Sequence, residues 1–192
     1  MQTPVKMIVV LSVLCGLSGF GLSYLKLHTA VPIENQVLRY VQGPAILKVF
    51  RQAQNSPIED RKVFTLKDGR TVNVFPSIIN GTLSGVALEG FGKGFGGDIG
   101  VIVGFDIASD SLAGIGITTM RETPGLGTRV AEDDFTAQFS GAVLPVELKS
   151  KGGSIDAVSG ATVSSTGAVA AISNAAAIYG EIKEQCLKAW SK

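Results

Sequence analysis

Residues 156–165, DAVSGATVSS, decide the fold because they lead directly into the Ala-rich C-terminal end of the chain. Ala is the strongest helix former, so residues 167–189 are predicted to form a long helix. Ser164 or Ser165 is predicted to be its N-cap, since a serine hydroxyl accepts a hydrogen bond from the free N–H groups of the first turn. The rest of the domain must therefore pack against one long C-terminal helix.

Upstream of that helix, the chain alternates short β-prone runs with turn residues. Asp68-Gly69 is a strong hairpin signal between the first two runs. Strands are predicted at residues 62–66, 70–75, 83–89, 99–106, 114–119 and 146–149. Helices are predicted at 34–50, with a kink at Gly43-Pro44, and at 131–139. The pattern predicts one α+β domain with a mainly antiparallel sheet flanked by helices.

The N-terminal segment is the most apolar part of the chain. Met7 to Leu25 contains no charged residue and comes close to the roughly 20 residues that cross a membrane. A cleaved signal peptide is the competing interpretation, but the run is longer than a usual signal core, and no small-x-small cleavage site stands before His28. We expect residues 1–28 to form an N-terminal cytoplasmic tip and a single transmembrane helix, and residues 29–192 to form one domain.

Charge and metal-binding residue types exclude several classes of function. The chain has 17 Lys and Arg against 16 Asp and Glu, so nothing favours nucleic-acid binding. Two isolated cysteines and one histidine cannot form a zinc or iron–sulfur site. We therefore expect no metal, and any redox chemistry would need an organic cofactor.

A glycine-rich stretch, GFGKGFGGDIG at residues 90–100, contains a formal G-x-G-x-x-G at Gly92, Gly94 and Gly97. A dinucleotide-binding fingerprint needs a helix after the glycines, but the following residues are typical of a strand. We interpret this stretch as a flexible or bulged connection between strands, close to a ligand or partner.

A second loop, ETPGLG at residues 122–127, combines a Pro-Gly turn with exposed backbone N–H groups. Leu126 between two glycines could cover a flat aromatic ring. From the residues alone, an ordinary turn after a strand is the simpler account.

The segment before the C-terminal helix can also be interpreted as a phosphate site. A phosphate there would meet the free N–H groups and the positive dipole end of the helix. Thr162 offers a hydroxyl that can take a phosphoryl group, while Gly160 and Ala161 leave room for a bulky group. A small-residue turn that caps the helix explains the same spacing.

The two motifs together resemble a known family. Residues 156–162 resemble the Asp-x-x-Ser-Gly-Ala-Thr motif recognised by bacterial flavin transferases, and residues 122–127 resemble the second signature of the same FMN-binding domain. The order of anchor, helix, glycine-rich stretch, loop, threonine motif and Ala-rich helix is similar to the G subunit of the Rnf ion-translocating ferredoxin:NAD oxidoreductase. The C subunit of the sodium-translocating quinone reductase belongs to the same family but is generally longer. Residues 109–112 match no family position.

The resemblance implies a set of cofactor-binding residues and no catalytic residue. Thr162 would carry FMN through a phosphoester bond. The phosphate would be surrounded by Ser159, Gly160, Ala161, Ser164 and Ser165, and the ring would lie beside Glu122, Thr123, Gly125, Leu126 and Gly127. Asp156 would either help the transferase, by deprotonating Thr162 or holding its metal, or cap the turn.

The implied function is electron transfer within a membrane redox complex of the bacterial inner membrane, with the domain on the periplasmic side. Other subunits would be the partners, together with a flavin transferase during maturation, and no independent catalysis is expected. Three alternatives stay open: the C subunit of a quinone reductase, an anchored assembly subunit without cofactor, and a free-standing flavoprotein reductase.

Overall fold

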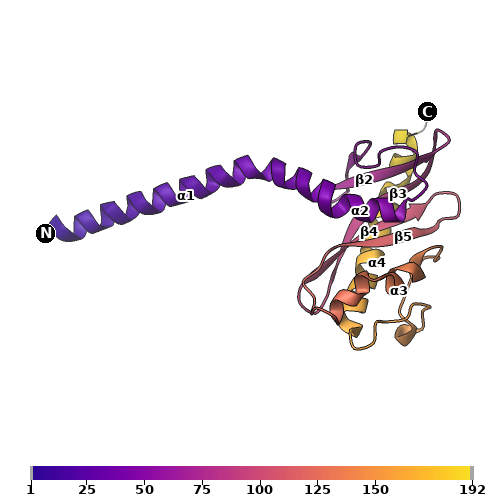
Figure 1. The fold of residues 1–192 in the computed structure, drawn as a ribbon. Helices are drawn as coiled ribbons and strands as arrows, with labels where there is room; N and C mark the ends of the chain where they lie inside the picture. The colour runs from indigo at the N-terminus through magenta and orange to yellow at the C-terminus, as the bar shows by residue number, and fades with distance from the viewer. Residues whose placement is uncertain (1, 191–192) are drawn as a thin grey trace. The chain divides into compact units, whose positions relative to one another are not determined.

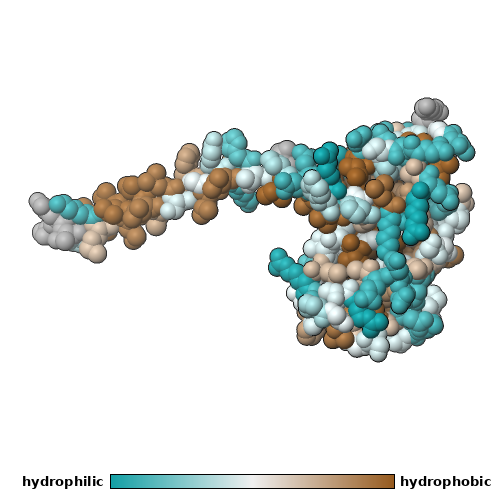
Figure 2. Space-filling model, in the orientation of Figure 1, coloured by the Kyte–Doolittle hydropathy of each residue, from teal (hydrophilic) through white to brown (hydrophobic). Residues whose placement is uncertain are grey.

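The computed structural model describes residues 2–190, which divide into a unit up to Arg39 and a unit from Tyr40 onward. The first unit is formed mainly by helix α1 (Gln2–Val37) (Figure 1). Its helical stretch contains an 18-residue window with a mean hydropathy of 2.1, none of which is buried. Figure 2 shows these apolar side chains as a brown section of the helix. By length and composition α1 can serve as a single-pass membrane anchor.

The second unit is built on a five-stranded sheet in which every neighbouring pair is antiparallel. The strands follow one another in space as they do in sequence, because each is joined to the next by a short connection. They are β1 (Lys62–Thr65), β2 (Thr71–Ile79), β3 (Thr82–Lys93), β4 (Asp98–Asp106) and β5 (Ser111–Thr119). The predicted α+β class with a mainly antiparallel sheet is confirmed.

Helices cover both faces of this sheet. The long helix α4 (Thr162–Trp190) lies along β3 and β4, and the short helix α2 (Gly43–Val49) contacts β4 and β5 (Figure 1). Since successive strand residues point to opposite faces, Gly92 lies beneath α4 whereas Gly104 and Gly116 lie beneath α2. A third helix, α3 (Asp133–Thr136), belongs to the segment between β5 and α4.

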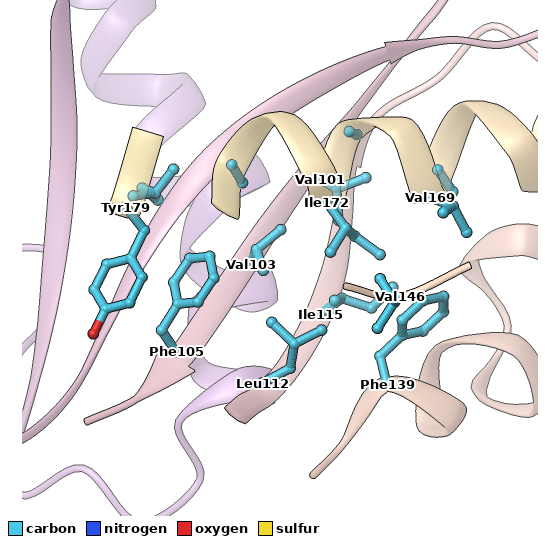
Figure 3. Packing of buried hydrophobic residues seen from close by; sticks show 14 of the residues in the cluster. Val101, Val103, Phe105, Leu112, Ile115, Phe139, Val146, Val169, Ile172 and Tyr179 are labelled. Carbon is cyan, nitrogen blue, oxygen red and sulfur yellow. The ribbon is translucent and has the colours of Figure 1, made fainter. Parts of the chain in front are cut away.

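The hydrophobic core lies between α4 and the sheet (Figure 3). Val101, Val103 and Ile172 are fully buried there. Phe105 and Tyr179 stack with their ring centroids 4.3 Å apart and their planes 10° apart. Burial raises the pKa of Tyr179 to about 12, and its ring packs as an apolar group in the core.

The glycine-rich stretch corrects one prediction. Strand β3 continues through Gly90 and Gly92 to Lys93, so only residues 94–97 connect it to β4. A Cβ atom at Gly90 would lie 2.9 Å from the Cβ of Ala175, and one at Gly92 would lie 2.6 Å from the backbone nitrogen of Ala171. Both glycines are required by the close approach of α4 to the strand, and neither forms a flexible connection.

The C-terminal helix begins earlier than predicted. It starts at Thr162 and not at residue 167, and the N–H of Ser165 donates to the carbonyl of Ala161 at 2.9 Å. Ser164 and Ser165 therefore lie inside the first turn, and neither is the N-cap. The sequence signal was misleading because serines can be buried in a first turn when their hydroxyls find partners there.

Other boundaries shift for local reasons. The predicted strand at 146–149 is wrong: Leu148 makes only an isolated bridge to Ile155, and Lys149–Lys151 forms a 3-10 turn. The predicted helix at 34–50 is split, because α1 runs to Val37 and a π-helical turn (Leu38–Gln42) precedes α2. The helix predicted at 131–139 comprises α3 and a 3-10 turn (Ala137–Phe139).

Gly92→Ala tests the contact between α4 and β3. The added methyl group would collide with the helix backbone, and such overpacking costs about 1–3 kcal/mol of unfolding free energy. Gly97→Ala is the matched control, because a Cβ there would meet its nearest neighbour at an ordinary 3.6 Å. Thermal unfolding of both variants, followed by circular dichroism, should show a lower midpoint for Gly92→Ala alone. Equal midpoints would contradict the packing role of Gly92.

Candidate functional site

An open pocket of about 300 Å³ lies at the N-terminal end of α4. Three segments meet there: the connection between β3 and β4, the loop after β5, and the turn that leads into α4. Its lining residues are Phe95, Glu122, Thr123, Leu126, Gly127, Gly160, Ala161, Thr162, Val163 and Ser164. The two motifs identified in the sequence are therefore adjacent in space, although 28 residues separate Gly127 from Asp156.

Glu122 joins the three segments through one buried carboxylate, and the residue is only 7% exposed. Its Oε2 accepts a hydrogen bond from the Ser164 hydroxyl at 2.5 Å, and its Oε1 accepts one from the N–H of Gly96 at 3.1 Å. Gly127 must lack a side chain because a Cβ atom would lie 2.8 Å from both the Glu122 and the Ser164 oxygens. This cluster fixes the floor of the pocket.

The start of α4 presents a hydroxyl and free N–H groups. Thr162 is exposed, and its hydroxyl makes no hydrogen bond within residues 2–190. No acidic residue occupies the first turn of this fully described helix, so the positive end of the helix dipole is not neutralised from within. Gly160 has φ +78°, a left-handed conformation that turns the chain sharply into the helix. An anionic group bonded to Thr162 would meet the free N–H groups at the positive end of the helix, with the Glu122 carboxylate also present in the pocket lining.

Three of the residues predicted for the site do not line the pocket. Ser165 is fully buried: its hydroxyl donates to the Ala161 carbonyl and accepts from the Val158 N–H, both at 3.0 Å. It therefore stabilises the turn and cannot reach a ligand. Ser159 is exposed outside the lining, and Gly125 lies in the loop turn with φ +73°. The other eight predicted residues come together.

Asp156 is exposed and stands outside the pocket lining. Its carboxylate pairs with the Lys149 ammonium at 2.7 Å. The Gln138 side chain clamps its backbone, accepting from the Asp156 N–H at 2.7 Å and donating to its carbonyl at 3.2 Å. The motif thus begins with a fixed backbone and an exposed carboxylate.

Phe95 and Val163 were missed from the sequence. They are 75% and 52% exposed, yet both line the pocket. The available signals were weak: Phe95 is an aromatic residue between glycines at a hairpin tip, and Val163 is the residue after Thr162.

Ser164→Ala tests the buried hydrogen bond to Glu122. The variant leaves one buried carboxylate oxygen without a donor, which costs about 1–3 kcal/mol of unfolding free energy. Ser173→Ala on the same helix is the control, because that serine is exposed and bonds to the carbonyl of Val169 within its own helix. Urea unfolding should show a lower midpoint for Ser164→Ala, while Ser173→Ala should change the free energy by less than about 0.5 kcal/mol. If the two variants unfold alike, the buried bond does not hold the site together.

The part of the chain that resembles a known family includes all the residues that line the pocket. Residues 94–177 match the family of the FMN-binding domain. Relatives named as the G subunit of an ion-translocating oxidoreductase complex include those of Shewanella piezotolerans, 31% identical over 57% of this chain and 56% of that protein, and Methanosarcina acetivorans, 34% identical over 50% and 52%. The Aliivibrio fischeri protein is 26% identical over 78% and 80%. This chain spans about half the length of the first two relatives.

Two solved structures share the fold. The C subunit of the Na⁺-translocating NADH-quinone reductase from Parabacteroides distasonis aligns with a TM-score of 0.51 and 22% identity over 58% of this chain and 62% of that one. Shewanella oneidensis NqrC aligns with a TM-score of 0.51 and 24% identity over 72% and 73%. The chain is therefore similar to the G subunits of ion-translocating oxidoreductase complexes, and its residues 94–177 match the FMN-binding domain.

Proposed function

We propose that the chain is an electron-transfer subunit of a membrane-bound ion-translocating ferredoxin:NAD oxidoreductase, with FMN attached to Thr162 through a phosphoester bond. The observation that carries this proposal is the Thr162 hydroxyl, which has no hydrogen-bond partner among residues 2–190 and lies at a helix N-terminus in a pocket with several apolar lining residues. The family match at residues 94–177 and the relatives named as G subunits support the choice of cofactor and complex.

The pocket residues fit a tethered flavin in two parts. The phosphate would contact the backbone N–H groups at the start of α4, which have no partner inside the helix. The Ser164 hydroxyl is already donated to Glu122, so it is not available to the phosphate. Beside the ring would lie Thr123, Leu126 and Gly127, and Leu126 would exclude water from part of one ring face.

The side chains of the pocket can bind and orient a redox group but offer no free acid or base among the residues that line it. Glu122 is the ionisable group of that lining, and both of its oxygens accept hydrogen bonds from the protein. FMN, when bound, supplies reversible electron-carrier chemistry of its own. The chain would then hold the cofactor and tune its surroundings without independent catalysis, as a subunit that exchanges electrons with partners does.

Maturation and location complete the proposal. A flavin transferase would recognise the exposed segment that begins at Asp156, whose carboxylate pairs with the Lys149 ammonium at the surface. The domain would lie on the periplasmic side of the bacterial inner membrane, with α1 as its anchor.

A role as the C subunit of a quinone reductase is the second candidate, and it is supported by likeness of fold. An anchored assembly subunit without cofactor is the third.

Thr162→Ala tests the attachment residue. The native protein should show flavin fluorescence after denaturing electrophoresis and the mass of one FMN adduct, and the variant should show neither. Thr166→Ala, one turn further along α4, is the control because its hydroxyl bonds to the Thr162 carbonyl and does not line the pocket. Fluorescence retained in denatured Thr162→Ala would refute attachment at this residue. A native protein without any FMN adduct would favour the assembly-subunit alternative.

Ser154→Cys tests the side of the membrane on which the domain lies. Ser154 is exposed on the domain, whereas Cys186 is buried and Cys15 lies within the apolar part of α1. A membrane-impermeant maleimide added to spheroplasts should therefore label the variant and leave the native chain unlabelled. Labelling only after the membrane is lysed would place the domain in the cytoplasm.

A further inference from the structure

We infer that Phe95 packs against the flavin ring and positions it, although neither motif includes this residue. The inference rests on the proposed function, because it concerns how the tethered flavin is held. Phe95 stands at the tip of the connection between β3 and β4 and lines the pocket together with residues of both motifs. It contributes nothing to the core, since 75% of the residue is exposed.

The hairpin tip that carries Phe95 is fixed on both sides of the residue. The N–H of Gly94 donates to the carbonyl of Gly97 at 2.8 Å and closes the turn. The N–H of Gly96 donates to the Glu122 carboxylate. A side chain at Gly96 would collide with the backbone carbonyl of Arg121, the residue before Glu122. The backbone around Phe95 is therefore held against the pocket floor while its ring stays outside the core. A fixed backbone that carries the exposed Phe95 ring indicates that this ring contacts a ligand or a partner.

Phe95 is one of three exposed apolar side chains that line the pocket. Leu126 is 43% exposed and Val163 is 52% exposed, and each comes from a different segment. Single exposed apolar residues are ordinary on protein surfaces, but three that converge on a polar floor call for a ligand with one apolar and one charged end. A tethered FMN has this character, with its phosphate at Thr162 and its flat ring among the apolar side chains.

The size of the pocket defines how much of the ring Phe95 can cover. At about 300 Å³ it lies at the lower end of the roughly 300–1,000 Å³ range of ligand pockets. The flavin would be held on a shallow surface and not enclosed. Under these conditions a stacked aromatic side chain has a large influence on ring orientation, because aromatic rings prefer offset-stacked or edge-to-face contacts.

Phe91 provides a matched control close by in the sequence. It lies in β3, four residues before Phe95, is 52% exposed and lines a different pocket beside Leu66 and Arg70. Its ring has the same chemistry and is also largely exposed, but it has no part in the flavin pocket. A substitution that acts only through general surface properties should have the same effect at both positions.

The test uses the full-length, flavin-loaded protein with Phe95→Trp and Phe91→Trp. An indole in contact with a flavin quenches its fluorescence by electron donation, so Phe95→Trp should lose most of its flavin emission at equal flavin content and show a shortened lifetime. Phe91→Trp should match the native protein. Phe95→Ala should make the flavin more accessible to iodide, and its reduction potential should shift relative to Phe91→Ala.

Flavin content at Thr162, measured by mass, separates the two levels of the proposal. If all variants carry flavin but Phe95→Trp emits as strongly as Phe91→Trp, the inference on Phe95 is overturned and the proposed function stands. If the native protein carries no flavin, the proposed function fails, and the inference fails with it.

Discussion

The close packing of α4 on β3 is the constraint on which the rest of the domain depends. Gly90 and Gly92 remove the side chains that would hold the helix away from the strand, and Gly167 does the same from the helix: a Cβ there would lie 2.5 Å from the carbonyl oxygen of Lys93. These contacts set the position of α4 along the strand as well as its distance. Because β3 ends at Lys93, the same contacts bring the first turn of α4 beside the hairpin tip at 94–97. The pocket exists because the core is packed in this register.

The second determinant is electrostatic and local. Burying the Glu122 carboxylate removes it from water, which is unfavourable unless donors replace the water. The Ser164 hydroxyl and the Gly96 N–H are those donors, and they come from α4 and from the hairpin tip. Because the Glu122 carboxylate needs both donors, it holds the loop after β5, the hairpin tip and the start of α4 in fixed positions relative to one another. The residue resembles a ligand contact in the sequence, but its observed contacts are with the protein itself.

The sequence predicted those features that depend on local chemistry. The Asp68-Gly69 hairpin and the Ala-rich helix follow from turn residues and helix propensity. The proximity of the two polar motifs was expected only from the resemblance to the FMN-binding family. The start of α4 could not be predicted, because Ser164 lies inside the helix owing to a partner far away in the sequence. The role of Gly90 and Gly92 depends on the packing of α4 against them, and this tertiary contact cannot be recognised from the local sequence. Phe95 escaped notice for the same reason, since nothing in a run of glycines indicates which aromatic residue faces a pocket.

A shallow pocket with a rigid floor suits the proposed role better than an enclosed one would. An enzyme that transforms a substrate must exclude water and supply groups that move protons, and such a site encloses its ligand. An electron carrier needs its redox group fixed, so that little reorganises during transfer, and accessible, so that partners can approach. In this domain buried contacts behind the pocket, through Glu122 and the start of α4, would fix the proposed redox group, while the apolar side chains that line the pocket remain exposed. Because α4 begins at Thr162, Ser164 is placed to bond the buried Glu122 carboxylate, while Val163 stays exposed beside the other apolar residues of the pocket.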